Sequence, residues 1–367
     1  MGKISTRAQN IEMSGIRKFF QAAKPDSISM ALGQPDFDTP DHIKQAAIQA
    51  IQEGKTGYTF NAGLPELREA ISGKLLRENR LDYPLDQIIV TAGAGEALFI
   101  AIQSLVDNGD RVLLTDPGFV SYEACVTLAG GICDFVPLTR DLHIDYTALT
   151  EKLKGARLLI INSPCNPTGI VETPEQIRAI VEAAMDAGVT VLSDEVYEHM
   201  IYDAVHASAA SFGEDVITVN AASKTYAMTG WRIGFISGPA DYMENCLKVH
   251  QYCQTCATSI SQYAAVAAYT GDQSCVTKMR DEYRVRRDIL VSGLNSMGVT
   301  FPEPQGAFYA FAPLGEERTK QVLDAGVIVV PGDAFGKRGS DYARFSYATS
   351  RENILAALER IRPVLER

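Results

Sequence analysis

Short runs of β-branched residues alternate with amphipathic helical patterns through the middle of the chain, and this alternation limits the possible folds more than any other feature. The runs occupy 88–93, 111–118, 156–164, 189–197, 216–223 and 233–239. Helical patterns separate most of them, at Glu96–Val106, Phe119–Ala129 and Pro174–Ala187. The alternation predicts a three-layer α/β fold, in which a mostly parallel sheet carries helices on both faces. In such sheets ligands bind outside the carboxyl ends of the strands.

The pattern changes after residue 240. Long helical patterns lie at about 240–256 and 273–297, and an α+β segment follows. That segment comprises Val299–Leu314, a helix near 316–325, strands around Val327–Val330 and Ala343–Tyr347, and a final helix from Glu352. A chain of 367 residues is long enough for a large domain and a smaller one. We therefore expect a large domain over residues 40–270 and a smaller α+β domain made of 1–39 with 271–367.

Charge and hydropathy exclude several classes of partner. The formal charge of −11 argues against binding to the phosphate backbone of nucleic acids, which needs clustered Lys and Arg. No apolar run reaches the roughly 18–20 residues that cross a bilayer, so we expect no membrane association. The first residues, MGKISTRAQNIEMSG, lack the apolar stretch of a signal peptide, which predicts a cytoplasmic protein.

The cysteines and histidines do not suggest a metal site. Seven cysteines form an odd set spread over a long chain, which is a poor disulfide framework. Cys253 and Cys256 make a C-x-x-C motif, but no second pair stands at zinc-ligand spacing beside it. The histidines also show no mutual spacing typical of metal ligation; they include His143, His199, His206 and His250.

Small residues follow the first run of the alternating region. Gly93-Ala94-Gly95 comes directly after the strand expected at 88–91, and a helix begins at once. Small residues let the backbone approach a ligand, and a helix N-terminus offers free N–H groups and a positive dipole end to a phosphate. A tight turn between strand and helix would also favour glycine, so the residues alone leave both interpretations open.

Polar residues end the next two buried runs. The segment Asn162–Gly169 contains two X-Pro steps, which force extended backbone. It is either a rigid turn or a loop that holds the Asn166 amide against a planar oxygen. The following run ends in Asp194, with the phenol of Tyr197 three residues later. Asp194 could cap a helix or serve as a carboxylate at the ligand edge of the sheet.

Lys224 ends the run at 216–223, where an ammonium group would be costly to bury unless it has a function. A desolvated lysine has a lowered pKa and can attack an aldehyde. Arg232 follows, and Gly230 lets the chain bend back so that the guanidinium can reach a phosphate.

Three motifs in this order, N-P-T-G at 166–169, D-x-x-Y at 194–197 and S-K-x-x-x-x-x-G-x-R at 223–232, resemble those of one family over nearly the full chain. The chain is similar to fold-type I pyridoxal-phosphate enzymes of the class I/II aminotransferase family, in the prokaryotic aspartate aminotransferase-like branch. The resemblance extends to Leu32–Phe37, Gly57-Tyr58, Pro117–Tyr122 and Ala343–Ser346.

The resemblance implies pyridoxal 5'-phosphate as cofactor and assigns residues to it. Lys224 would hold it as a Schiff base and, once displaced by substrate, act as general base and acid for the 1,3-proton shift. Asp194 would pair with the protonated pyridine nitrogen, while Tyr197 and Asn166 would hydrogen-bond the phenolic oxygen. The remaining contacts are Phe119 stacked on the ring and, at the phosphate, the Ala94 and Gly95 backbone with the Arg232 guanidinium.

The same resemblance implies a shared site and a carboxylate clamp. Tyr58 would reach the phosphate of the neighbouring subunit, so the active form would be a homodimer. Arg344 would bind the substrate α-carboxylate as a bidentate fork, helped by the Gly33 backbone and the Asn166 amide. One position departs from the family pattern: many relatives carry a phosphate-binding hydroxyl where this chain has Ala221, and Ser223 is the candidate to replace it.

The expected reaction is transamination between an L-amino acid and a 2-oxo acid such as 2-oxoglutarate, by a ping-pong cycle that stores the amino group as pyridoxamine phosphate. The donor stays open between aspartate and aromatic or other neutral amino acids. The helix after Gly95 lacks the lysine of some relatives, and the orientation of Arg17 cannot be inferred from sequence. The alternative enzyme is a pyridoxal-phosphate-dependent C–S β-lyase. A transcription regulator built on this fold would need a fused DNA-binding domain of roughly 60 residues, for which the chain has no room.

Overall fold

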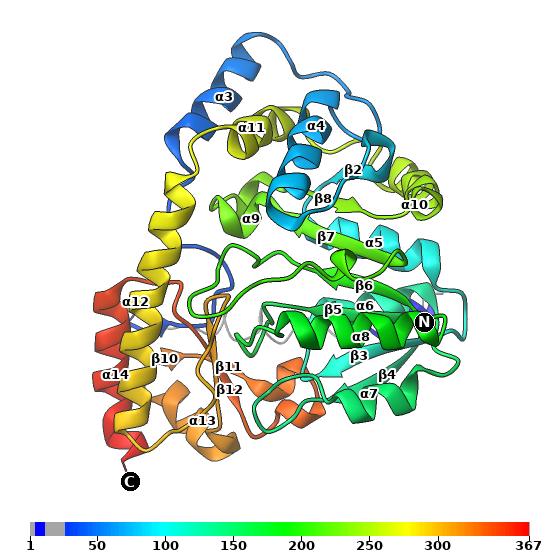
Figure 1. Ribbon diagram of the computed structural model, residues 1–367. Coiled ribbons are helices and arrows are strands. Elements are labelled where there is room, and N and C mark those ends of the chain that lie inside the picture. Colours follow the sequence, from blue (N-terminus) through cyan, green and yellow to red (C-terminus); the bar gives the residue numbers. More distant parts are fainter. Residues whose placement is uncertain (1–3, 12–25, 367) are drawn as a thin grey trace.

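A seven-stranded sheet forms the centre of the molecule, whose computed structural model describes residues 4–11 and 26–366. Its strand order is β2-β8-β7-β6-β5-β3-β4 (Figure 1). The strands are β2 (Ile88–Thr91), β3 (Arg111–Asp116), β4 (Ile132–Pro137), β5 (Leu158–Asn162), β6 (Thr190–Asp194), β7 (Val216–Ala221) and β8 (Gly234–Ser237). Only β8 runs antiparallel to its neighbours, so the predicted mostly parallel α/β sheet is confirmed.

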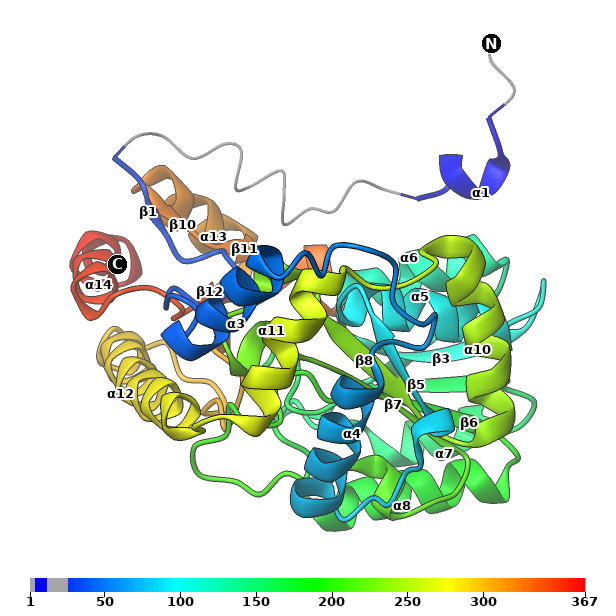
Figure 2. The same ribbon diagram turned by 90° about the horizontal axis from the view of Figure 1, so that it is seen from above.

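Helices cover both faces of this sheet, as Figure 2 shows. The helices α5 (Ala94–Leu105), α6 (Val120–Ala129) and α10 (Ala240–Cys253) share one apolar cluster with the strands, and α7 (Tyr146–Leu153) and α8 (Pro174–Asp186) share another. Every residue of β6 and β7 is buried, as expected for strands packed on both sides. α8 begins at a capping box between Thr173 and Gln176.

A third group of helices packs around the β2 and β8 end of the sheet. It contains α3 (Asp41–Gln52), α4 (Pro65–Lys74) and α11 (Ser259–Thr270), which share a cluster with residues of both strands. Sequence patterns had not indicated α11. The helix expected at about 240–256 is α10, which ends at Cys253, and α11 begins at Ser259.

A smaller sheet lies beside the large one. Its strands β9 (Tyr309–Ala312), β11 (Val330–Pro331) and β12 (Ala343–Ser346) are antiparallel, in the order β11-β12-β9. Next to it, β1 (Ile28–Ser29) pairs in parallel with β10 (Val327–Ile328). The helices of this region are α12 (Ser274–Ser296), α13 (Gly315–Asp324) and α14 (Arg351–Leu365). The small antiparallel sheet agrees with the expected α+β segment, while the division into 40–270 and 1–39 with 271–367 stays a prediction.

One expected strand in this region was wrong in detail. The strand expected at Val327–Val330 is divided between two sheets, because β10 pairs with β1 while β11 pairs with β12. Most of Val299–Leu314 is irregular, and only its last part forms β9. Within residues 4–11 and 26–366, no helix combines the length and apolarity needed to cross a membrane.

Candidate active site

The predicted site residues lie where strands of the large sheet end. Asp194 is the last residue of β6, Asn166 lies in the loop after β5, and Lys224 lies in the short helix α9 (Ala222–Thr225) that follows β7. Because β8 runs in the opposite direction, Arg232 stands before its first residue at this same edge. The topology therefore brings these side chains to one edge of the sheet, as the sequence predicted. Arg17 lies outside the described residues.

The amine of Lys224 is held by backbone and aromatic groups. Its Nζ donates a hydrogen bond of 2.6 Å to the Gly33 carbonyl oxygen. The same nitrogen lies 5.7 Å from the Tyr197 ring centroid and 5.8 Å from that of Phe308. Burial, aided by the positive charge of Arg344, lowers the pKa of Lys224 to about 8. A useful fraction of the amine is therefore uncharged near neutral pH, as a nucleophilic lysine requires.

Asp194 is a buried carboxylate with hydrogen-bond donors, and no Lys, Arg or His of the described residues forms an ion pair with it. The Tyr122 hydroxyl donates to Oδ2 at 2.8 Å, and the Val196 N–H donates to Oδ1 at 3.3 Å. Burial raises the pKa of Asp194 to about 6 even though these hydrogen bonds oppose the change. A positively charged group next to Asp194 would stabilise the ionised form of its carboxylate. Sequence reasoning missed the role of Tyr122, which lies on α6 three residues after Phe119.

Arg344, on β12, is a buried guanidinium with one unsatisfied donor among the described residues. It donates to Asn166 Oδ1 at 2.8 Å and to the Ala31 carbonyl oxygen at 2.7 Å. Its Nε has no hydrogen-bond partner, and in the described part of the chain no carboxylate lies within ion-pair distance of it. Burial lowers the pKa of Arg344. A buried cation without a carboxylate is costly, so the arrangement suits a ligand that brings its own carboxylate.

Tyr197 and Tyr309 form a hydrogen-bonded pair beside Lys224. Their hydroxyl oxygens are 2.9 Å apart, and both side chains are buried. The Tyr309 hydroxyl also lies 2.6 Å from the position that a Cβ at Gly33 would occupy, so position 33 has no room for a side chain. Tyr309 was missed in the sequence, where it reads only as part of an apolar strand.

The turn after β2 forms a cradle at the N-terminus of α5. Gly93 has a φ of +84°, and a Cβ there would lie 2.8 Å from the Arg232 guanidinium. Arg232 donates to the Thr229 and Ala92 carbonyl oxygens at 3.0 and 3.3 Å and is otherwise exposed. A Cβ at Gly95 would meet nothing within 4 Å, so space remains over the first turn. A helix N-terminus with a neighbouring guanidinium suits a phosphate.

A buried pair beneath this cradle was not recognised in the sequence. The carboxylate of Glu96 accepts the Ala92 N–H and contacts Nδ1 of His250 at 2.7 Å. The other ring nitrogen of His250, which is fully buried, faces the Asn61 carbonyl oxygen at 2.9 Å. Because both ring nitrogens face acceptors, the pair ties the turn after β2 to the loop that carries Tyr58.

Two predicted cofactor contacts, Phe119 and Ser223, pack within the protein. The Phe119 ring packs edge-on against Tyr122, with centroids 5.5 Å apart and an interplanar angle of 80°. Ser223 and Ala221 are both buried at the end of β7. The cofactor roles of Phe119 and Ser223 stay predictions.

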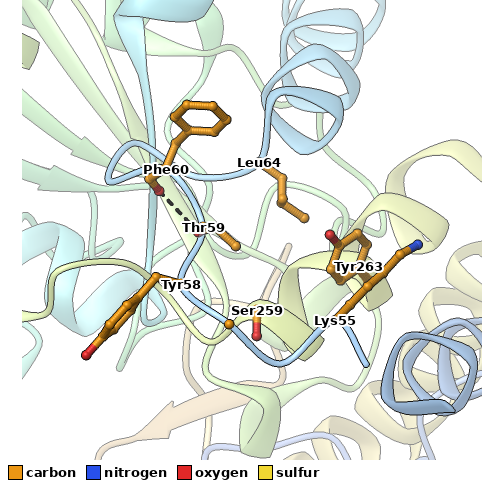
Figure 3. Close-up of a pocket in the computed structure, with 8 residues that line it drawn as sticks. Lys55, Tyr58, Thr59, Phe60, Leu64, Ser259 and Tyr263 are labelled. Carbon is orange, nitrogen blue, oxygen red and sulfur yellow. Dashed lines mark hydrogen bonds between the residues drawn. The ribbon is translucent and has the colours of Figure 1, made fainter. Parts of the chain in front are cut away.

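Tyr58 does not join the Lys224 group within this chain. Its side chain is 89% exposed, and in the described part of the chain its hydroxyl has no hydrogen-bond partner. It borders a surface pocket, in which Figure 3 shows it pointing away from Tyr263 and Lys55. The lining residues are Lys55, Gly57, Tyr58, Thr59, Phe60, Leu64, Ser259 and Tyr263. A tyrosine so placed is available to a second protein chain.

A buried polar network lies behind the site. Glu198 forms an ion pair with Lys74 and accepts hydrogen bonds from Asn79 at 2.8 Å and Asn220 at 2.6 Å. The charge of Lys74 counteracts burial and holds the pKa of Glu198 well below its ordinary value. Although Glu198, Glu195 and His206 lie close enough to share an ion, the Lys74 ammonium already supplies the positive charge there.

Comparison with known proteins gives consistent matches over the whole chain. The family model described as "Aminotransferase class I and II" matches residues 25–361. A probable aspartate aminotransferase of Methanocaldococcus jannaschii is 44% identical, over 99% of this chain and 100% of that protein. Aromatic-amino-acid aminotransferase 2 of Thermococcus litoralis is 38% identical, over 99% and 98%. The structure of Thermus thermophilus aspartate aminotransferase with maleate superposes with a TM-score of 0.95 at 37% identity, covering 99% of this chain and 100% of that one.

Proposed function

The chain belongs to the class I and II aminotransferase family, and from this premise we propose that it uses pyridoxal 5'-phosphate held by Lys224. As an aminotransferase it moves an amino group between an L-amino acid and a 2-oxo acid. We propose aspartate or an aromatic amino acid as donor and 2-oxoglutarate as acceptor, in line with the names of the relatives. The comparisons give no support to the β-lyase alternative.

The residues present suit this cofactor. The Lys224 amine, with its pKa lowered to about 8, is available to an aldehyde, and the turn at Gly93 with Arg232 is available to a phosphate. Asp194 suits a protonated ring nitrogen, which would supply the positive partner that this carboxylate lacks. When bound, pyridoxal phosphate supplies an electron sink for the negative charge that develops at the substrate Cα.

Each side chain then has a defined task. Once displaced by substrate, Lys224 Nζ would take the proton from the substrate Cα and deliver it to the cofactor carbon bonded to the amino nitrogen, a 1,3-proton shift within one half-reaction. Asp194 holds the proton on the ring nitrogen in place. Tyr197 and the amide nitrogen of Asn166 donate to the phenolic oxygen, and the Oδ1 of Asn166 meanwhile orients Arg344. The Phe119 ring covers one face of the cofactor.

One observation carries the substrate class: within residues 4–11 and 26–366 the buried Arg344 guanidinium has two hydrogen-bond partners, the Asn166 amide oxygen and the Ala31 carbonyl oxygen. Neither of these oxygens carries a full negative charge that would neutralise the guanidinium. The Nε atom of Arg344 has no hydrogen-bond partner among the described residues. A planar fork of this kind matches a carboxylate geometrically. We therefore propose that Arg344 binds the α-carboxylate of the amino acid, with the Gly33 backbone beside it.

We also propose that the active form is a homodimer in which Tyr58 reaches the phosphate site of the partner subunit. Its 89% exposure and the Glu96–His250 link from its loop to the cradle support this arrangement. All seven cysteines are free, which agrees with the reducing conditions of the cytoplasm, where we propose that the enzyme works.

A single-turnover experiment tests the proposed function. Protein loaded with pyridoxal phosphate is mixed with aspartate, tyrosine, phenylalanine or alanine, and the visible absorbance of the cofactor is followed before and after 2-oxoglutarate is added. We expect at least one donor to abolish the absorbance and 2-oxoglutarate to restore it, while Lys224→Ala does neither. Failure of every donor would refute the assignment, and pyruvate and ammonia released from a cysteine conjugate without an acceptor would indicate a lyase instead.

A further inference from the structure

We propose that Tyr309 is a positioning residue that joins the carboxylate-binding Arg344 to the Tyr197 hydroxyl. The inference rests on the proposed function, because it gives Arg344 and Tyr197 the ligand contacts described above. It goes beyond that function by assigning two separate tasks to one buried side chain: the ring supports the guanidinium, and the hydroxyl orients the phenol.

The ring of Tyr309 lies against the guanidinium of Arg344. The Arg344 Cζ is 4.3 Å from the ring centroid, closer than to any other aromatic ring of the described residues, the next being Phe335 at 4.8 Å. The strand register explains the contact, because Arg344 on β12 pairs with Phe311 and Tyr309 stands two positions away on β9. Residues on this diagonal share one face of the sheet. The ring face attracts the cation and limits the planes that the guanidinium can adopt.

The hydroxyl of Tyr309 contacts a different group. It lies 2.9 Å from the Tyr197 hydroxyl, and no other hydrogen bond of this hydroxyl is found among residues 4–11 and 26–366. When Tyr197 donates its proton to a ligand oxygen, its own oxygen is left as an acceptor, and Tyr309 is placed to donate to it. A donor there strengthens the hydrogen bond that Tyr197 gives, since successive hydrogen bonds polarise one another.

The absence of a side chain at Gly33 leaves room for the Tyr309 hydroxyl. A side chain at position 33 would collide with it at 2.6 Å, and the Gly33 carbonyl accepts the Lys224 amine at 2.6 Å. Tyr309 thus touches three parts of the proposed site while being only 1% exposed. It acts through Arg344 and Tyr197, the groups proposed to contact the ligand, and is therefore a positioning residue and not a catalytic one.

The test uses the loaded enzyme with Tyr309→Phe, which removes only the hydroxyl, and Tyr309→Leu, which also removes the ring. Two quantities are measured: the pKa of the cofactor chromophore on Lys224, from visible absorbance against pH, and the Kd of two unreactive acids, maleate and 3-phenylpropionate. The matched controls are Tyr347→Phe and Tyr347→Leu. Tyr347 is a buried tyrosine of the same apolar cluster whose hydroxyl donates to the Ala307 carbonyl oxygen, and no ring contact with the Arg344 guanidinium is found for it among the described residues.

We expect Tyr309→Phe to raise the chromophore pKa by about 0.5 or more, because the weaker donor leaves the phenolic oxygen less stabilised when ionised. The Kd of the acids should stay within about twofold. In the Tyr197→Phe background the same change should have no further effect, since the hydroxyl acts through Tyr197. Tyr309→Leu should raise the Kd of the acid that the unaltered enzyme binds by about tenfold, or about 1.4 kcal/mol.

The outcomes separate this inference from the proposed function. If Tyr197→Phe raises the chromophore pKa but Tyr309→Phe does not, or if the two effects add fully, the role of the hydroxyl is wrong. If Tyr309→Leu weakens acid binding no more than Tyr347→Leu does, the role of the ring is wrong. Should Tyr309→Leu fail to fold, the Tyr309→Phe cycle still decides. An unaltered protein that forms no chromophore would overturn the proposed function itself.

Discussion

The Arg344 guanidinium donates to the Asn166 side-chain oxygen at 2.8 Å, which joins a strand of the small sheet to the loop after β5 of the large sheet. The two residues are 178 positions apart in sequence. Their contact fixes the carboxylate-binding fork relative to the groups proposed to bind the cofactor.

Arg344→Lys should lower kcat/KM for the preferred donor by about 100-fold, mostly through a higher KM. A lysine keeps the charge but cannot form two parallel hydrogen bonds with a carboxylate, and a hydrogen bond to a charged group contributes about 1.5–3 kcal/mol. Steady-state kinetics measures the change, with Arg318→Lys on the exposed face of α13 as the matched control. Equal kinetic effects of the two variants would contradict the role of Arg344.

Asp194→Asn should stabilise the cofactor-free protein more at pH 7.5 than at pH 4.5. Burial raises the folded-state pKa of Asp194 from 3.8 to about 6, so the free energy of unfolding falls as pH rises through this window and stays lower above it. At 1.36 kcal/mol per pH unit the loss is about 3 kcal/mol at most. Thermal unfolding at both pH values measures it, with exposed Asp82→Asn as control. If the variant were stabilised equally at both pH values, the raised pKa of Asp194 would not be the cause.

Lys224 should capture pyridoxal phosphate at a rate that rises with pH and levels off above about pH 8. The uncharged amine is the nucleophile, and burial lowers its pKa to about 8, whereas an exposed lysine would continue to gain reactivity up to about pH 10.4. Rapid-mixing absorbance gives the rate, and borohydride reduction followed by peptide mapping gives the position. Lys224→Ala should lose the reducible adduct and Lys320→Ala, an exposed lysine, should keep it. A reducible adduct that persists in Lys224→Ala would show that a different lysine binds pyridoxal phosphate.

Tyr58→Phe should weaken the binding of pyridoxal phosphate by about tenfold without changing the melting temperature of the cofactor-free protein. The hydroxyl would contribute one hydrogen bond to a charged phosphate, about 1.5–3 kcal/mol, and has no hydrogen-bond partner among the described residues of its own chain. Equilibrium dialysis measures the affinity, sedimentation the oligomeric state, and Tyr146→Phe, half-exposed on α7, is the control. Full affinity in a strict monomer would refute the shared site.

His250→Ala should lower the free energy of unfolding by about 1–3 kcal/mol, because it leaves the mostly buried Glu96 carboxylate without its hydrogen-bond partner. Adding Glu96→Gln should restore part of the loss, since the amide carries no charge. Denaturant unfolding of the two single variants and the double variant gives the coupling between them. Additive losses would mean that the two side chains do not depend on each other.

The residues that sequence could predict share a local signature. Lys224, Asp194 and Asn166 each follow a buried apolar run, so strand prediction alone brings them to one edge, and the spacing of Gly230 and Arg232 marks a turn. Arg344 could be singled out only through the family motif, because an arginine in a short strand reads equally well as a surface residue. Whether these residues contact a cofactor stays a prediction.

The residues that were missed act through partners distant in sequence. Tyr122 and Asp194 are 72 positions apart, Tyr197 and Tyr309 are 112 apart, and Glu96 and His250 are 154 apart. Each reads locally as an ordinary helical or strand residue, and only the folded chain brings it to its partner. Strand β4 was missed for another reason: it is an edge strand whose residues are mostly half-buried or exposed, so its sequence lacks a continuous apolar run.

The reversed strand β8 has a consequence for how the protein is made. It lies between β2 and β7, and β2 has no other neighbour in the sheet. During synthesis the early segment Ile88–Thr91 must therefore wait until residues 234–237 have left the ribosome before it can pair. The glycine turn that follows β2 is among the first parts of the sheet region to be translated and among the last to reach its final position. A truncated chain that stops before β8 should therefore be unable to bind pyridoxal phosphate stably, even if its other strands assemble.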